Sequence, residues 1–255
     1  MKNKIGYIFD KYWKGVVSIT FFLAIWEISV PDGSMRKFFI SRPSLIFQNG
    51  VDLINSGFLW PHVVTSLQNL LIGIFCAAVV GVFLSLFIGT QKKMYGFFEP
   101  YIYVLSTVPK VAFLPLIILW VGVGVYSKIL IVFISALIPI LINALQGIES
   151  VRKEYLSMAR SFGASKFQII KHVIFFDMLP FLFSGLKIAI GRGVSGLIVA
   201  EAFGVGSGLG YLVSFYGLTF QSGKLMFIIF LLFLMVMILK NIIGEIQKHM
   251  LRYKR

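Results

Sequence analysis

Two basic side chains, Lys110 and Arg192, lie in stretches of the chain that are otherwise strongly apolar. A charge inside a membrane is costly and usually faces a bundle interior or a water-filled path. Arg192 has two open interpretations, contact with an anion or structural pairing with a carbonyl or carboxylate group. Lys110 either lines the path or anchors at an interface. Asn143 and Ser195 could hydrogen-bond a substrate, although bonding between helices is the safer expectation. These four side chains are the candidates for the lining of a path.

The elements that must position these side chains are membrane-spanning helices. The chain has 255 residues, of which 58% are hydrophobic and 13% are charged. Because a helix of roughly 20 apolar residues crosses a bilayer, this length accommodates about six spans and no sizeable soluble domain. The apolar runs that predict these spans are 16–30, 63–89, 102–121, 129–148, 174–200 and 225–243. We therefore expect an all-α integral membrane protein with a single domain over residues 1–255.

Prolines and small residues inside the predicted spans indicate a path rather than a passive anchor. Pro109, Pro115 and Pro139 are expected to interrupt or kink their helices and to free backbone carbonyls. The fifth span carries a stripe of small residues for close packing against another span or a second copy of the chain: Gly185, Ala189, Gly193, Gly196 and Ala200. Lys187 lies on a different face, where snorkelling to the interface is expected.

The net charge of +14 indicates membrane orientation rather than nucleic-acid binding. Basic residues outside the spans concentrate near both termini, at 92–93 and at 151–171. Since cytoplasmic segments are rich in Lys and Arg, we expect both termini in the cytoplasm and outer loops at 31–62 and 201–224. Glu27 and Glu201 can reach an interface, so structural roles are expected for both. Cys76 is the single cysteine, which excludes a disulfide framework and favours a small buried packing residue.

The main polar interruption, residues 151–173, falls between the fourth and fifth spans, on the expected cytoplasmic side. One face of its first half has apolar residues at helical spacing, namely Tyr155, Met158, Ala159 and Phe162. Gly163 then permits a left-handed stop, so the segment predicts a helix, a sharp bend and a second helix. Two interpretations stay open at this point, an amphipathic segment lying on the bilayer or a docking site for a partner.

The order and spacing of several motifs resemble the permease subunits of bacterial ABC importers, of the nitrate, sulfonate and taurine type. ARSFGAS at 159–165 is similar to the centre of that family's cytoplasmic E-A-A segment. Other matches run along nearly the whole chain: Trp26-Glu27, RPS at 42–44, PKVAFLPLIILWVGVGVYSK at 109–128, PILIN at 139–143, Leu179-Pro180 and GSGLGY at 206–211. Each match is weak alone, but together and in order they make a strong resemblance.

The chain departs from the family's pattern at two places. Ser157 stands where the family has its Glu, and Phe175-Phe176 stands where the family has Leu-Pro. Glu154 lies one helical turn before Ser157 on the same face, so its carboxylate can partly replace the missing one. Docking is therefore expected to depend on shape and apolar contact more than on charge.

The resemblance implies that segment 151–173 is a coupling helix that docks on an ATP-binding subunit. The residues implied in this contact are Glu154, Ser157, Met158, Ala159, Arg160, Phe162 and Gly163. The implied partners are two ATP-binding subunits that carry ATP and Mg, a second permease copy and an extracytoplasmic substrate-binding protein, in the bacterial inner membrane. A homodimer is favoured over a heterodimer. The chain has no G-x-x-x-x-G-K-[ST] loop, so we expect no ATPase activity and no cofactor or metal in it.

The same resemblance implies that the solute is a small anion such as a sulfonate, nitrate or taurine. Related permeases also serve vitamin precursors, so a thiamine pyrimidine or riboflavin is the alternative. An autonomous secondary transporter is less favoured, since no convincing inverted repeat is visible in the hydropathy. A membrane enzyme is a further class, but His62, His172 and His249 lie in separate regions and form no catalytic spacing.

Overall fold

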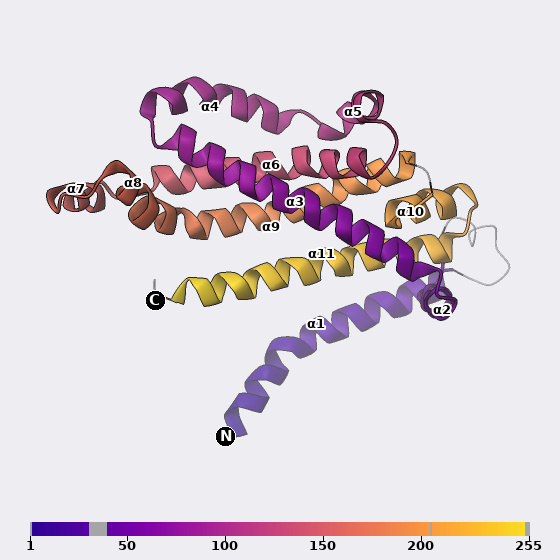
Figure 1. Ribbon diagram of the computed structural model, residues 1–255. Helices are drawn as coiled ribbons and strands as arrows, with labels where there is room; N and C mark the ends of the chain where they lie inside the picture. The colour runs from indigo at the N-terminus through magenta and orange to yellow at the C-terminus, as the bar shows by residue number, and fades with distance from the viewer. Residues whose placement is uncertain (1, 31–39, 205, 253–255) are drawn as a thin grey trace. The chain divides into compact units, whose positions relative to one another are not determined.

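The computed structural model describes residues 2–30, 40–204 and 206–252, with side chains from Trp13 onward. Within these ranges the chain is helical and has no strand (Figure 1). Part of the predicted outer loop, 31–39, and the basic side chains of the first twelve residues lie outside the description.

Backbone contacts divide the chain into two compact parts, residues 1–60 with 212–231 and residues 61–211 with 232–255. The first part holds α1 (Lys2–Ser29), α2 (Pro43–Asn55), most of α10 (Leu209–Leu218) and the beginning of α11 (Ser222–Met250), whose remainder belongs to the second part. The second part contains nearly all of α3 (Leu59–Gly89), together with α4 (Lys92–Thr107), η2 (Lys110–Phe113), α5 (Leu114–Val121), α6 (Val125–Glu149), α7 (Lys153–Ser161), α8 (Lys166–Ile169), η3 (Ile170–Ile174) and α9 (Phe175–Phe203).

Within the first part, Glu27 near the end of α1 holds the start of α2. Its Oε2 accepts a hydrogen bond from the Ser44 backbone N–H at 3.0 Å, and its Oε1 accepts one from the Ser44 hydroxyl at 2.6 Å. The first turn of a helix has unpaired N–H groups and a partial positive charge, so a carboxylate stabilises it. The expected structural role of Glu27 is confirmed, although α2 itself lies where a loop was expected.

The second part is built on α6 and α9, which run side by side (Figure 1). The predicted stripe of small residues on α9 is buried. A Cβ added to Gly185 would lie 2.9 Å from the Asn143 Cβ and 3.0 Å from the Pro139 carbonyl oxygen, both on α6. Ala136, Ile140 and Ala189 join these helices in a fully buried cluster. The stripe therefore packs against a span of the same chain, as one of the two expected alternatives had it.

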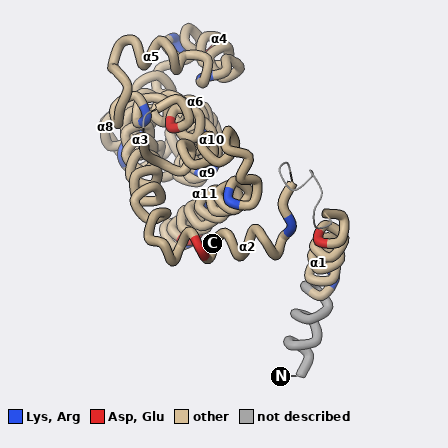
Figure 2. The backbone as a smooth tube through the Cα atoms, turned by 90° about the vertical axis from the view of Figure 1, so that its right-hand side faces the viewer, with Lys and Arg blue, Asp and Glu red and all other residues tan. Residues whose placement is uncertain are grey.

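The described residues contain four or five candidate membrane spans, where six were expected. Four helices are long and apolar enough to cross a membrane: Leu59–Gly89, Val125–Glu149, Lys166–Phe203 and Ser222–Met250. Much of their length carries no charged residue (Figure 2). The pair Lys92–Thr107 and Lys110–Val121 qualifies only when both halves are taken together. The predicted span at 16–30 lies within α1, and its crossing of the membrane stays a prediction.

The third predicted span, 102–121, is not a continuous helix but is broken near Pro109. Its two halves are bent by 87° relative to one another. Pro109 disfavours helical geometry in the residue before it, and Val108 is accordingly extended, with φ −68° and ψ 131°. Pro115 lies in the first turn of α5, where a missing N–H is tolerated. The prolines thus interrupt this span as expected, whereas α6 continues through Pro139.

The expectation for Cys76 is wrong for a reason that composition does not reveal. Cys76 is exposed on the surface of α3 rather than buried. An apolar residue of a membrane helix faces either protein or lipid, and an all-apolar run does not distinguish the two sides. The expected outer loop 201–224 contains the helix Leu209–Leu218, which is too short to cross a membrane, and its position outside the membrane stays a prediction.

Candidate functional site

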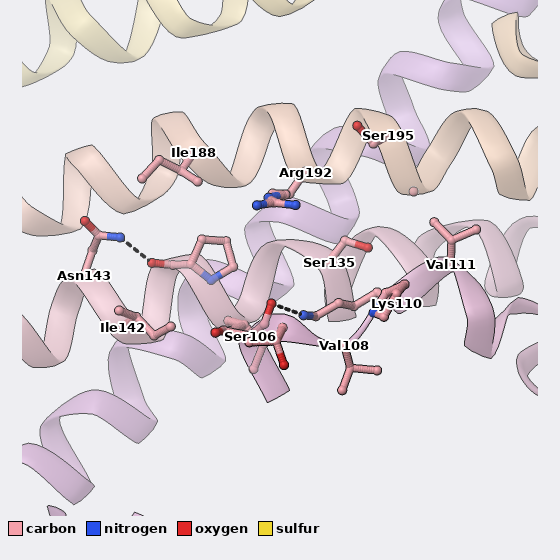
Figure 3. A pocket seen from close by; sticks show the side chains of 15 residues that line it. Ser106, Val108, Lys110, Val111, Ser135, Ile142, Asn143, Ile188, Arg192 and Ser195 are labelled. Carbon is pink, nitrogen blue, oxygen red and sulfur yellow. Dashed lines mark hydrogen bonds between the residues drawn. The ribbon is translucent and has the colours of Figure 1, made fainter. Parts of the chain in front are cut away.

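A cavity of about 530 Å³ lies among the α4–α5 break, α6 and α9 (Figure 3). All four side chains predicted to line a path contribute to its wall, namely Lys110, Asn143, Arg192 and Ser195. They come from three separate stretches of the chain. The break after Val108 is what brings the loop that carries Lys110 against the other two helices. The hydroxyl groups of Ser106 and Ser135 add further polar wall.

Arg192 projects from α9 into this cavity (Figure 3). In the part of the chain that the structure describes, its guanidinium forms no hydrogen bond and no ion pair. The structural interpretation required a carbonyl or carboxylate partner, and none is found there. A guanidinium has five N–H donors and is always charged, so an anion in the cavity would satisfy it.

Lys110 lines the same cavity and is positioned by the end of α4. Its ammonium group donates a hydrogen bond to the carbonyl oxygen of Ser106 at 3.0 Å (Figure 3). It donates another to the carbonyl oxygen of Leu105. Carbonyls in the last turn of a helix lack partners within the helix, and here Pro109 prevents the helix from continuing. The side chain therefore caps α4 while it holds a positive charge at the cavity wall.

Asn143 and Ser195 form hydrogen bonds within their own helices, so the expectation of bonding between helices is wrong for both. The Asn143 amide donates to the Pro139 carbonyl at 2.8 Å, and the Ser195 hydroxyl donates to the Gly191 carbonyl at 3.1 Å. Both side chains keep an oxygen that can accept from a ligand. Because Pro139 has no N–H, the carbonyl oxygen of Ser135 lacks the hydrogen-bond donor that a regular α-helix would provide.

The cavity therefore combines two cationic groups with hydroxyl and amide groups. Among the described residues, no Asp or Glu lines it. Its volume is within the range of roughly 300–1,000 Å³ typical of small-molecule sites. Because charges in a membrane are weakly screened, the two cations favour a small anion there over a neutral or cationic solute.

At the start of the helix that carries Arg192, segment 151–173 has the predicted shape, a helix, a bend and a second helix. Gly163 forms the bend at φ +76°, a conformation that other residues adopt only with strain. The Gly163 N–H donates to the Arg160 carbonyl at 2.9 Å, and the Ala164 N–H donates to the Ala159 carbonyl at 3.0 Å. These two bonds form a complete Schellman motif, which fixes the direction in which the chain leaves α7.

The apolar side chains of α7 divide between the protein core and the surface. Leu156 and Ala159 pack against a buried cluster beneath the segment. Met158 and Phe162 stay 58% and 85% exposed. Together with Tyr155 they line a groove of about 330 Å³ whose other wall is formed by His172, Val173, Phe176 and Asp177. The predicted stripe is thus confirmed as one face, except that Ala159 points partly inward. The second wall of the groove was not predicted.

The polar residues implied in docking lie on the open side of α7. Glu154, Ser157 and Arg160 are all exposed. Glu154 is in the first turn of the helix and Arg160 in the last, where their charges suit the helix dipole. No described residue pairs with either charge, so both are accessible to a partner.

A buried polar network, which the sequence did not reveal, lies at the other end of α9. Glu201 was expected to reach an interface, but it is only 1% exposed. Its carboxylate accepts a hydrogen bond from the Ser66 hydroxyl, which lies 2.8 Å from both oxygens, and another from the Gly210 N–H at 2.9 Å. The Ser66 oxygen in turn accepts from the Leu209 N–H at 2.7 Å. The carboxylate therefore joins α3 to the turn that begins α10.

Lys128 and His62 extend this network to the same turn. Lys128 is 3% exposed and donates to the Ser207 carbonyl oxygen at 2.8 Å. The Nδ1 atom of His62 accepts a hydrogen bond from the Gly208 N–H at 3.1 Å. Polar residues His62, Ser66 and Asn69 recur at helical spacing along one face of α3. That recurrence within an apolar run was the one local signal that could have indicated the network.

Comparison with known proteins shows which family this chain belongs to. Residues 59–252 match the family described as binding-protein-dependent transport system inner membrane component. The taurine transport system permease protein TauC of Escherichia coli is 35% identical over 159 residues, which cover 62% of this chain and 58% of that protein. The match to TauC therefore spans somewhat more than half of its length.

Two further relatives cover more of both chains. The putative aliphatic sulfonates transport permease protein SsuC of Bacillus subtilis is 31% identical over 79% of this chain and 73% of its own. The nitrate import permease protein NrtB of a Synechocystis species is 30% identical over 83% of this chain and 80% of its own.

The fold is also found in a solved structure of an inward-facing methionine ABC transporter. The TM-score is 0.69 at 19% identity, and the match covers 77% of this chain and 99% of that one. Such a low identity shows a shared fold alone. The family match and the permease relatives together cover most of the sequence, so this chain belongs to the inner membrane components of binding-protein-dependent transport systems and is an ABC importer permease.

Proposed function

We propose that this permease moves a small anion through the cavity lined by Lys110 and Arg192. The observation that carries this proposal is the Arg192 guanidinium, which faces the cavity without a partner among the described residues. Three relatives are named for taurine, aliphatic sulfonates and nitrate, and each of these solutes presents negatively charged oxygens. A guanidinium donates two parallel hydrogen bonds to such an oxygen pair.

The complex that uses this path contains a second permease copy, with a homodimer favoured over a heterodimer. Two ATP-binding subunits carry ATP and Mg and hydrolyse the nucleotide, and an extracytoplasmic binding protein delivers the anion. Membership of the family supports these classes of partner. The distribution of Lys and Arg supports termini in the cytoplasm of a bacterial cell, and it supports a position for segment 151–173 on the same side as ATP.

Segment 151–173 is the proposed contact with the ATP-binding subunit. Its docking set is Glu154, Ser157, Met158, Ala159, Arg160, Phe162 and Gly163. The exposed Met158 and Phe162 side chains provide apolar anchors of the kind that dominate binding energy at interfaces. Behind the bend, Lys166–Phe203 forms one candidate span of 38 residues that also carries Arg192. Movement at α7 would therefore pass through the bend to this span and shift the part of the cavity wall that the span forms.

Uptake by the assembled complex in proteoliposomes tests the anion path. Arg192→Ala removes charge-assisted hydrogen bonds that contribute about 1.5–3 kcal/mol, so uptake of taurine or nitrate should fall about tenfold or more. Arg192→Lys keeps the charge without the paired geometry and should retain part of the uptake. Arg252→Ala removes an arginine that does not line the cavity and should leave uptake unchanged.

Three outcomes separate this proposal from its alternatives. Equal anion uptake with and without the Arg192 guanidinium removes this side chain from the path. Uptake of a thiamine pyrimidine or riboflavin, with no uptake of anions, makes a vitamin precursor the solute. Uptake that continues without ATP-binding subunits indicates a secondary transporter.

A further inference from the structure

Helices α9 and α11 carry the same short pattern, a lysine followed four residues later by a glycine. The pattern reads KIAIG at 187–191 and KNIIG at 240–244. A Cβ built on Gly191 would lie 3.8 Å from the Lys240 ammonium, and one built on Gly244 would lie 3.8 Å from the Lys187 ammonium. Each lysine therefore reaches across to the glycine of the other helix, and the two helices are antiparallel where they meet.

The two ammonium groups have few partners within the chain. Lys187 donates a hydrogen bond to the Gln247 side-chain oxygen at 2.6 Å. Lys240 forms no hydrogen bond or ion pair with any described residue. The neighbouring carboxylate of Glu245 is already paired with Lys248 at 2.6 Å. Two positive charges thus lie in one seam without a described carboxylate to neutralise them.

The seam is placed at the edge of the membrane and is open to its surroundings. Lys240 directly follows the apolar run 225–239 of α11, so it lies where that run leaves the hydrocarbon region. Lys240 is exposed and Lys187 is half-buried. The neighbouring Ile238 and Ile242 side chains are 56% and 49% exposed, as expected of a surface that contacts acyl chains. Snorkelling to the interface explains each lysine taken alone. It does not explain why each of the two lysines contacts the glycine of the opposite helix.

We propose that this lysine seam, formed by Lys187, Gly191, Lys240, Gly244 and Gln247, binds the phosphate of an anionic phospholipid headgroup. Phosphate oxygens accept hydrogen bonds from both ammonium groups at once. The Gln247 oxygen is taken by Lys187, which leaves the amide NH₂ free to donate to the same phosphate. Basic pockets between membrane helices are a common form of headgroup site. The glycines, which have no side chain, allow each ammonium group to approach the backbone of the opposite helix.

This site is separate from the anion cavity. The lining of the cavity contains Ile188, Arg192 and Ser195 of α9, and neither Lys187 nor any residue of α11. A phospholipid held in the seam would connect α11 to α9, the helix that carries Arg192. Lipid composition would then affect the stability of this helix pair.

The test uses the full-length chain in nanodiscs of phosphatidylcholine with increasing amounts of phosphatidylglycerol. Lipid binding is measured as the change in the temperature of thermal unfolding. Phosphatidylglycerol should raise the unfolding temperature of the unaltered chain. Since a lysine near a membrane surface contributes about fivefold in affinity for anionic lipid, Lys240→Gln should weaken the response about fivefold. Lys187→Gln combined with Lys240→Gln should weaken it about 25-fold.

Matched variants and a free anion show which residues and which ligand cause a rise in the unfolding temperature. Lys248→Gln neutralises an exposed lysine of the same helix that is already paired, and it should leave the response unchanged. Replacement of both seam lysines by arginine should retain it. Lys240 has no described partner, so the single Lys240→Gln change tests the proposal even if the double variant does not fold. An equal lipid response in Lys240→Gln and the unaltered chain overturns the proposal. Stabilisation by inorganic phosphate in pure phosphatidylcholine, at the same strength, assigns the seam to free anions and overturns the lipid assignment.

Discussion

The two ends of the long helix Lys166–Phe203 differ in how their side chains are satisfied. At the far end, Glu201 is 1% exposed and its carboxylate is bonded to groups of the same chain. Next to the near end, Phe162 and Met158 on α7 stay largely exposed although both are apolar. The Glu201 carboxylate is thus satisfied within the chain, whereas the apolar side chains at the α7 end are left uncovered by the described residues.

This difference predicts which property a mutation changes at each end. A buried donor left without an acceptor costs about 1–3 kcal/mol of folding free energy, so changes around Glu201 should lower stability. Truncation of an exposed side chain usually changes stability by about 0.5 kcal/mol or less, but an interface anchor can contribute most of a binding energy. Changes on α7 should therefore alter assembly rather than folding.

The largest expected effect on stability is that of Glu201→Ala. The Ser66 hydroxyl and the Gly210 N–H both lose their acceptor while they remain buried. We expect the free energy of unfolding to fall by about 4 kcal/mol, measured by thermal unfolding in detergent. Glu201→Gln keeps one acceptor oxygen and should cost about half as much.

Glu154→Ala is the matched control at the other end of the helix. Glu154 is also a glutamate, but it is exposed and no described residue pairs with it. Its removal should change the free energy of unfolding by about 0.5 kcal/mol or less. Similar losses in the two alanine variants would contradict the comparison between the two ends.

A smaller effect on stability is expected for Gly208→Ala, which changes the turn that Glu201 holds. Gly208 has φ +115°, and an added Cβ would fall on the Glu201 carboxylate. We expect a loss of about 2–3 kcal/mol from backbone strain and overpacking together. Gly206→Ala is the control, since Gly206 has φ +81° with open space around it and should lose only about 1 kcal/mol. If the two variants lose equal stability, the carboxylate does not fill the space beside Gly208.

The sequence predicts those features that depend on neighbouring residues. Apolar runs predict the helices, and the small residues of α9 predict its close packing against another helix. Gly163 predicts the bend, because only a positive φ there closes the turn after α7. The four side chains of the cavity are also identified one by one, since each is polar in an apolar stretch.

The features that could not be predicted depend on residues far apart in the chain. Glu201 and its partner Ser66 are separated by 135 positions, so local composition cannot distinguish a buried carboxylate from an interfacial one. Lys110 and Arg192 line the same cavity only because the chain bends by 87° near Pro109. A proline predicts that a helix breaks, but it does not predict the direction of the break. His172 and Phe176 form the second wall of the groove because α7 folds back beside them. The spacing of apolar residues along the sequence does not predict this contact.

The smallest effect on stability is expected for Phe162→Ala, together with a large effect on assembly. Phe162 is 85% exposed, so its removal should change the free energy of unfolding by about 0.5 kcal/mol or less. Loss of an aromatic anchor from an interface costs about 2 kcal/mol or more, so binding of the ATP-binding subunit should weaken about thirtyfold. Pull-down of that subunit with purified permease measures the affinity. Phe203→Ala removes an equally large side chain that is 73% exposed at the Glu201 end, and it should leave the affinity unchanged. If both variants bind the subunit as tightly as the unaltered chain, the exposed face of α7 is not a docking surface and faces lipid instead.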